Sequence, residues 1–170
     1  MGRLDGWDLP ALLVEFLEAF VHQALHARRL YDDRAFERRR LYGAFVHKSR
    51  HPGLNDYVRD AVASLKGAIA KEALLQLSVV FFARDGEAVE KVTVNLKRVR
   101  LGTLDANSLK DLESGFRNAL LKLSFVDALI EPLPPGERNA VHSKNLTKLW
   151  ENFTTNKRVQ FQILASGWRL

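Results

Sequence analysis

The chain has 170 residues, a length typical of one domain, and its 46% hydrophobic and 27% charged residues match a globular protein rather than a disordered one. It contains no cysteine, which excludes disulfide frameworks, thiolate zinc sites and cysteine nucleophiles. The formal net charge is +6, and residues 137–170 contribute six basic and two acidic side chains to it. The rest of the chain is therefore nearly neutral. This distribution of charge gives only weak support to nucleic-acid binding. Residues 1–10 show no signal-peptide pattern and no run approaches the ~18 apolar residues of a membrane span, so we expect a soluble intracellular protein without membrane contact.

A long amphipathic helix is predicted first, from Leu9 to about Leu30–Tyr31. Asp8 is a suitable N-cap, and Pro10 would lie in the first turn, where its missing N–H costs nothing. Apolar residues recur at the spacing of one helix face: Leu9, Leu12, Leu13, Phe16, Leu17, Phe20, Val21, Ala24 and Leu25. Because two phenylalanines belong to this face, we expect the helix to be the central and most buried one.

Residues 32–53 read as an irregular connection that contains only a short strand at Phe45–His47. Pro52 then starts a second predicted helix, whose single apolar stripe continues to Ile69. The stripe consists of Leu54, Tyr57, Val58, Ala61, Val62, Leu65 and Ile69.

Two strands are predicted next. The continuous apolar run Leu74–Ala83 is typical of a strand that is buried on both faces. Asp85-Gly86 is a favoured hairpin turn. Beyond it, Val92, Val94 and Leu96 alternate with polar residues, which predicts a strand with one packed and one solvated face.

A third amphipathic helix is predicted from about Asn107 to Ser124, and a short apolar stretch over residues 125–130 follows it. The proline-rich segment 132–136 must break regular structure. In the last part of the chain, alternation over Val159–Ile163 predicts one late strand.

Glu18, His22 and His26 stand at i, i+4 and i+8 of the first helix, a spacing that could present zinc ligands on one face. A helix drifts by about 40° over each pair of i+4 steps, so three such ligands rarely converge on one ion. We interpret them as residues of the solvated side, and we predict neither a metal nor a cofactor.

The run Glu37-Arg38-Arg39-Arg40 has two interpretations. It could contact phosphates as part of a basic nucleic-acid-binding module together with the tail. Short runs of this kind are more often a solvated or partner-facing surface, and Glu37 dilutes the charge. We therefore expect no strong direct binding of nucleic acid.

Catalytic templates are missing from the sequence. It has no nucleophile elbow, no glycine-rich phosphate loop and no dinucleotide fingerprint. His47 and His51 have no acidic neighbour at a meaningful spacing, so only a pocket that joins one of them to a carboxylate would indicate an enzyme. We expect a binding protein and not an enzyme.

Several residue clusters stand in a distinctive order along residues 9–136. They are Leu13–Glu18, Tyr31, Phe36 with Arg38–Arg40 and Tyr42, His51–Tyr57, the strand pair 77–96, Phe116–Ser124 and Pro134–Gly136. This series resembles the HORMA-domain family, and within it the non-catalytic accessory subunits of translesion DNA polymerase zeta, which are similar to spindle-checkpoint HORMA proteins. The resemblance implies an α+β fold of three helices on an antiparallel β-sheet, with a HORMA core over residues 1–136 and a tail over residues 137–170.

The resemblance also implies a mode of action. In this family a carboxyl-terminal segment, the safety belt, closes over a short partner peptide that pairs with a sheet edge. The expected function is that of a nuclear adaptor, with a cytoplasmic pool, in translesion DNA synthesis and the DNA-damage response. It would bind a peptide of the polymerase zeta catalytic subunit and bridge to an inserter polymerase. The alternative within the same fold is a regulator of the cell cycle at the spindle checkpoint.

Four site residues follow from the resemblance by position. Tyr57 matches an aromatic residue that lines the peptide seat, although it could equally fill the stripe of the second helix. Arg117 matches an arginine used in HORMA homo- or heterodimers, and Arg38 and Lys122 match basic positions near the same surface. Alternatively, Arg117 is simply a solvated residue on the surface of its helix.

The resemblance stops after Gly136. The family continues there with a β-rich belt, whereas residues 137–170 have no recognisable version of it and offer one strand. The tail is either a divergent belt or a truncated one, and a truncated belt could not encircle a peptide.

Overall fold

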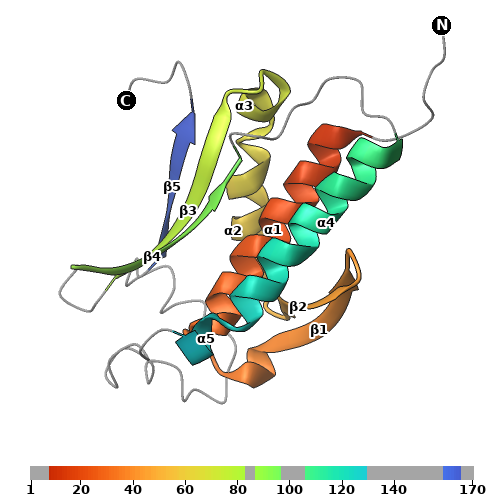
Figure 1. Cartoon of the computed structure of the whole chain (residues 1–170). Helices are drawn as coiled ribbons and strands as arrows, with labels where there is room; N and C mark the ends of the chain where they lie inside the picture. Colours follow the sequence, from red (N-terminus) through yellow and green to blue (C-terminus); the bar gives the residue numbers. More distant parts are fainter. Residues whose placement is uncertain (1–7, 83–86, 97–105, 130–158, 166–170) are drawn as a thin grey trace, which may run out of the picture.

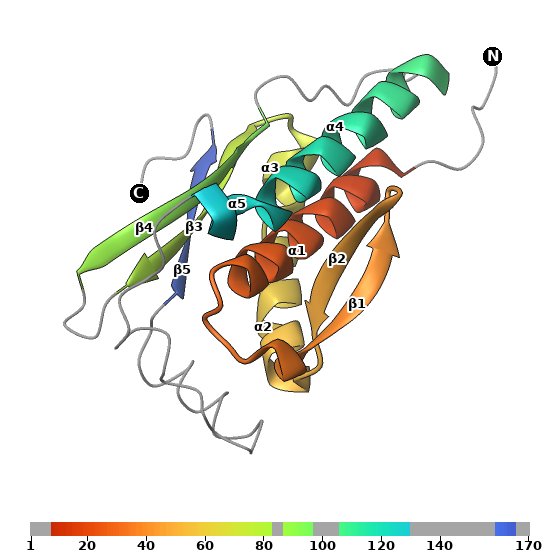
Figure 2. The same ribbon diagram turned by 60° about the horizontal axis from the view of Figure 1, so that its bottom comes forward.

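The computed structural model describes residues 8–82, 87–96, 106–129 and 159–165. A helical layer lies against a three-stranded sheet, and a separate β-hairpin lies on the other side of the helices (Figures 1 and 2). This confirms the expected α+β fold. The predicted boundary at residue 136 lies outside the described residues.

Helix α1 (Leu9–Ala27) is the centre of the molecule, as predicted. It contacts α2, α3, α4, β2 and β3, and Leu17, Val21, Ala24 and Leu25 are fully buried. The side chain of Asp8 accepts a hydrogen bond from the Ala11 N–H, so the predicted N-cap is confirmed. The helix ends earlier than predicted because Arg29 adopts a left-handed conformation (φ 49°), which terminates helices.

The prediction of an irregular connection over residues 32–53 was wrong. After a short 3-10 turn, η1 (Asp33–Ala35), β1 (Phe36–Leu41) and β2 (Ala44–Ser49) form an antiparallel hairpin that packs on α1 and α4. Tyr42 and Gly43 form its turn, both with positive φ (49° and 74°), which suits the right-handed twist of the strands. The short strand expected at Phe45–His47 is the middle of β2.

The second predicted helix is two helices. α2 (Pro52–Ala63) starts as predicted with Pro52 in its first turn, and its N-cap is His51, whose Nδ1 accepts a hydrogen bond from the Leu54 N–H. α3 (Lys66–Ala70) follows after a break. At the break the Ser64 hydroxyl donates to the Ala61 carbonyl at 2.6 Å, a local bond that competes with helix continuation.

The sheet has the order β4-β3-β5, and all its pairs are antiparallel. β3 (Leu74–Phe82) is central and buried along most of its length, and β4 (Ala88–Asn95) alternates between exposed and half-buried residues, as predicted. β5 (Val159–Ala165) confirms the predicted late strand and brings part of the tail into the sheet. The predicted turn at Asp85-Gly86 lies outside the described residues.

Helix α4 (Ala106–Ser124) lies beside α1 in both views (Figures 1 and 2), and a single turn, α5 (Val126–Leu129), follows it. The rings of Phe16 and Phe116 stack at 4.1 Å between centroids and join the two helices. Leu120 is fully buried in the same contact region. Among the described helices, none is both long and apolar enough to cross a membrane.

Candidate partner-binding surfaces

Tyr57 lies on the outer side of α2. The stripe that α2 buries consists of Leu54, Val58 and Val62, which are 5%, 0% and 2% exposed, whereas Tyr57 is 38% exposed. Partial burial raises the pKa of its phenol. Tyr57 thus lies at the margin of the buried stripe, with part of its surface exposed, and its place in a peptide seat stays a prediction.

Arg117 lies on α4 against the turn of the hairpin. Its guanidinium is 3.8 Å from the position that a Cβ atom on Gly43 would occupy. The neighbouring turn residue Tyr42 packs its ring at 5.3 Å from that of Phe116, and its hydroxyl donates to Glu15 Oε2 at 2.9 Å. Burial and the Glu15 carboxylate raise the pKa of Tyr42. The hairpin turn is thus fixed between α1 and α4, and the exposed Arg117 covers it.

Arg38 lies in the middle of β1 and is exposed. Its guanidinium carbon is 3.6 Å from the centre of the Phe45 ring, a cation–π contact, and Phe45 itself is 52% exposed. Lys122 is exposed on α4, five positions after Arg117. The predicted dimer residues therefore occupy two adjacent elements, α4 and the hairpin.

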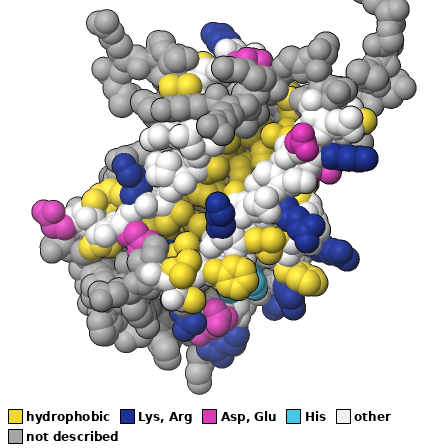
Figure 3. All heavy atoms as spheres, in the orientation of Figure 1, with side chains coloured by type: hydrophobic (Ala, Val, Ile, Leu, Met, Phe, Trp, Pro, Cys, Tyr) yellow, Lys and Arg dark blue, Asp and Glu magenta, His cyan; other side chains and the backbone are white. Residues whose placement is uncertain are grey.

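These elements present one mixed surface. Figure 3 shows Lys and Arg side chains over α4 and the hairpin, around exposed hydrophobic groups. Arginine beside an exposed aromatic ring is a common composition of the residues that dominate binding energy at protein interfaces. The surface suits a protein partner with acidic and apolar groups.

A polar network that the sequence did not indicate holds the hairpin on the helices. The Gln23 side chain accepts a hydrogen bond from the His47 backbone N–H at 2.9 Å and donates to the Ser124 hydroxyl at 3.3 Å. The His47 ring stacks on that of His26, with 3.5 Å between centroids, and burial together with the Arg38 charge lowers the pKa of His47. No periodic pattern signals this network, since its members lie on three separate elements.

His22 corrects another expectation. It was assigned to the solvated side of the first helix, but it is only 2% exposed because the hairpin covers that side of α1. His26 instead contacts His47 and lies 3.5 Å from Asp33, so Glu18, His22 and His26 do not converge. Within the described residues, no group of three or more His, Asp or Glu side chains has the arrangement of a metal site.

The sheet provides a second kind of surface. β3 is paired on both sides, so in the described part of the chain the outer edges of β4 and β5 have no neighbouring strand. The outer edge of a sheet can hydrogen-bond an added extended segment through its main chain. The outer edges of β4 and β5 are therefore the places on this sheet where an extended segment could be added.

Comparison with known proteins gives close counterparts for most of the chain. No protein-family model matches it. It is 32% identical over 132 residues to the human mitotic spindle assembly checkpoint protein MAD2B, and 33% identical over 137 residues to the DNA polymerase zeta processivity subunit of Arabidopsis thaliana. These matches cover 77% and 79% of this chain but 63% of each relative, so the chain spans less than two thirds of their length.

Solved structures agree on the fold. A chain in the crystal structure of the mitotic checkpoint complex matches with a TM-score of 0.68 at 17% identity, over 96% of this chain and 79% of that chain. C. elegans HTP-2 bound to the HIM-3 closure motif matches with a TM-score of 0.61 at 13% identity, over 95% of this chain and 73% of that one. By sequence and fold together, the chain is similar to MAD2B and to the DNA polymerase zeta processivity subunits over most of its length, and it has the fold of HORMA-domain structures.

Proposed function

We propose that this chain is a non-enzymatic adaptor of translesion DNA synthesis and the DNA-damage response. The observation that carries the proposal is the 33% identity to a DNA polymerase zeta processivity subunit over 79% of the chain. In this role it binds a short peptide of the polymerase zeta catalytic subunit and bridges that subunit to an inserter polymerase. Its place of action is the nucleus, with a cytoplasmic pool.

Two structural features support peptide binding. One is the pair of sheet edges on β4 and β5, which supply main-chain hydrogen-bonding groups. The other is the exposed ring of Tyr57 on α2, an aromatic group with the polar hydroxyl that is common at interfaces. The solved structure of HTP-2, which has the same fold, contains a closure motif as its bound partner.

A titration by calorimetry tests this proposal. The chain is mixed with a proline-containing peptide from the polymerase zeta catalytic subunit, and a version extended with the carboxyl-terminal segment of the Arabidopsis relative serves as the comparison. Equal affinity of the two proteins means that the tail present here suffices for binding. Tighter binding by the extended version assigns the difference to the belt. If neither protein binds, the adaptor proposal is wrong.

The mixed surface of α4 and the hairpin supports a further part of the proposal, a HORMA homo- or heterodimer through Arg117, Arg38 and Lys122. Arg117 lies against the hairpin turn and Arg38 stacks on an exposed ring, so both cations are positioned rather than freely extended. Positioned arginines lose less side-chain entropy on binding than extended ones.

A second candidate function is regulation of the spindle checkpoint. It is favoured by the relative named as a mitotic checkpoint protein and by the fold match within the mitotic checkpoint complex. A competition experiment separates the two functions. An excess of a peptide from a checkpoint partner should displace the polymerase peptide only if both use the same seat, and the tighter of the two peptides identifies the better-supported function.

A further inference from the structure

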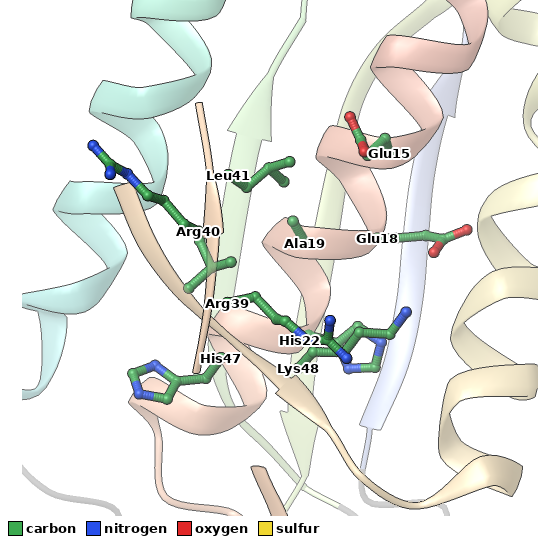
Figure 4. Close-up of a pocket in the computed structure, with 10 residues that line it drawn as sticks. Glu15, Glu18, Ala19, His22, Arg39, Arg40, Leu41, His47 and Lys48 are labelled. Atoms are coloured by element: carbon green, nitrogen blue, oxygen red, sulfur yellow. The ribbon is translucent and has the colours of Figure 1, made fainter. Parts of the chain in front are cut away.

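A groove of about 250 Å³ lies between α1 and the β1–β2 hairpin (Figure 4), and we call it the α1–hairpin groove. Pockets for drug-sized ligands usually measure about 300–1,000 Å³. The groove therefore suits a single chemical group on a side chain rather than a nucleotide or a coenzyme. None of the four predicted site residues, Tyr57, Arg117, Arg38 and Lys122, lines it, although it shares the hairpin with the predicted dimer surface.

His22 lines the groove and carries a buried polar atom without a partner. The residue is 2% exposed, and its Nδ1 atom is buried without a hydrogen-bond partner. Buried side-chain polar atoms are satisfied in the large majority of cases, so an orphaned nitrogen in a groove indicates a missing partner. A neutral imidazole can carry its proton on Nδ1 and donate it to an acceptor in the groove.

Two cations of the hairpin face the same space. Arg39 and Lys48 lie on the hairpin face that carries the buried Val46, because β1 and β2 alternate their side chains between two faces. Figure 4 shows both side chains directed toward His22, whereas Arg40 and His47 point the other way.

The charges of these two groups are only partly compensated. Arg39 pairs with Glu37 through Nε and Nη2, which leaves its Nη1 outside that pair. Lys48 makes no ion pair within the described residues.

We propose that the α1–hairpin groove binds an oxyanion, a carboxylate or phosphate group on a partner's side chain, through Lys48, Arg39 and the Nδ1–H of His22. Charge-assisted hydrogen bonds from ammonium and guanidinium groups are the strongest that side chains offer to such an anion. Glu15 is already occupied by the Tyr42 hydroxyl. Glu18 lines the groove as well, and its negative charge weakens the binding of the anion.

The test uses the full chain and nuclear magnetic resonance of the His22 ring nitrogens, titrated at constant ionic strength with inorganic phosphate, acetate or chloride. Phosphate or acetate should shift these signals saturably, and chloride should not. Saturation by phosphate alone assigns the site to a phosphorylated side chain, and saturation by acetate as well assigns it to a carboxylate.

Variants decide whether the binding is specific. Lys48→Gln should weaken binding by at least about threefold, since it removes one charge-assisted contact. Glu18→Gln should tighten it, because it removes the opposing charge. Lys71→Gln, an exposed lysine just after α3 and outside the groove, is the matched control and should leave binding unchanged. The absence of a saturable His22 shift overturns the proposal, and so does a Lys71→Gln effect as large as that of Lys48→Gln.

Discussion

Arg28 Nη2 lies 2.6 Å from Glu90 Oε2, and this ion pair is buried, with side chains that are 1% and 14% exposed. Arg28 Nε donates to the same carboxylate oxygen at 2.8 Å. Arg28 caps the carboxyl end of α1, and Glu90 lies on β4, so the pair joins the helical layer to an outer strand of the sheet.

The first prediction concerns this ion pair. Glu90→Gln removes the carboxylate charge that faces the buried Arg28 guanidinium, so the free energy of unfolding should fall by about 3 kcal/mol. Urea denaturation followed by circular dichroism measures the change. The double variant Arg28→Met with Glu90→Leu should recover most of the loss, because an apolar pair has no charge to desolvate. A single variant as stable as the parent would contradict the prediction.

The elements that the sequence predicted correctly are those whose partner is a continuous apolar layer. α1, α4, β3 and β4 each bury one face or both against the core, and a buried face leaves a period in the sequence. For β3 the signal was a continuous apolar run, which predicted burial on both faces.

The hairpin and the groove could not be predicted in this way. β1 carries three consecutive arginines, whose exposed side chains hide its alternation, and β2 is held by a hydrogen bond from the His47 backbone to Gln23 of another element. The burial of His22 depends on where the hairpin packs, which no local pattern of α1 encodes. The role of Tyr57 in binding was predicted from the resemblance alone. Its exposure depends on which face α2 packs against the core, and the buried residues of that face are Leu54, Val58 and Val62.

The second prediction concerns the hairpin turn. Gly43 has φ +74°, a conformation in which a side chain costs roughly 1–2 kcal/mol, so Gly43→Ala should lower the stability of the chain by about that amount. Gly115 lies inside α4 with open space around it, so Gly115→Ala should raise stability by about 0.5–1 kcal/mol. Thermal or urea unfolding of the two variants should give opposite signs, and equal signs would refute the assignment of the turn.

The third prediction is a dependence of stability on pH. Burial, and then the charge of Lys48, lower the pKa of His22 from 6.5 to about 4 in the folded chain. Between these values the unfolded chain binds a proton that the folded chain does not, so stability rises with pH across this window. The contribution of His22 is complete above pH 6.5, and about 3 kcal/mol of it is lost as the pH falls toward 4.

Urea titrations at several pH values check this dependence. His22→Asn keeps a polar group but does not titrate, so its stability should change less between pH 6.5 and 4 than that of the parent. If the free energy of unfolding changes equally with pH in the two proteins, His22 does not contribute to the pH dependence of stability.

The fourth prediction tests the peptide seat. Tyr57→Ala should weaken binding of the polymerase zeta peptide by roughly tenfold or more, the effect of removing an aromatic residue that dominates an interface. Because Tyr57 is only 38% exposed, the truncation also removes some packing, so circular dichroism should confirm that the variant is folded under the conditions of the titration. Calorimetry gives the affinity, and Arg59→Ala on the same helix is the control for a general effect of α2 surface changes. Binding at full strength would remove Tyr57 from the seat.

The fifth prediction tests the dimer surface on α4 and the hairpin. Arg117→Ala should sediment as a monomer at concentrations where the parent chain forms dimers, because it removes a positioned guanidinium beside the hairpin turn. Arg38→Ala and Lys122→Ala should weaken the dimer to a smaller extent.

Lys110→Ala, at an exposed position of α4, controls for loss of charge alone and should leave the dimer intact. Because Arg117 is exposed, its variant should keep the parent's circular dichroism spectrum, so a monomer reports the interface and not the fold. A parent that is monomeric at every concentration, or an Arg117→Ala protein that dimerises like the parent, would rule out this surface as the site of self-association.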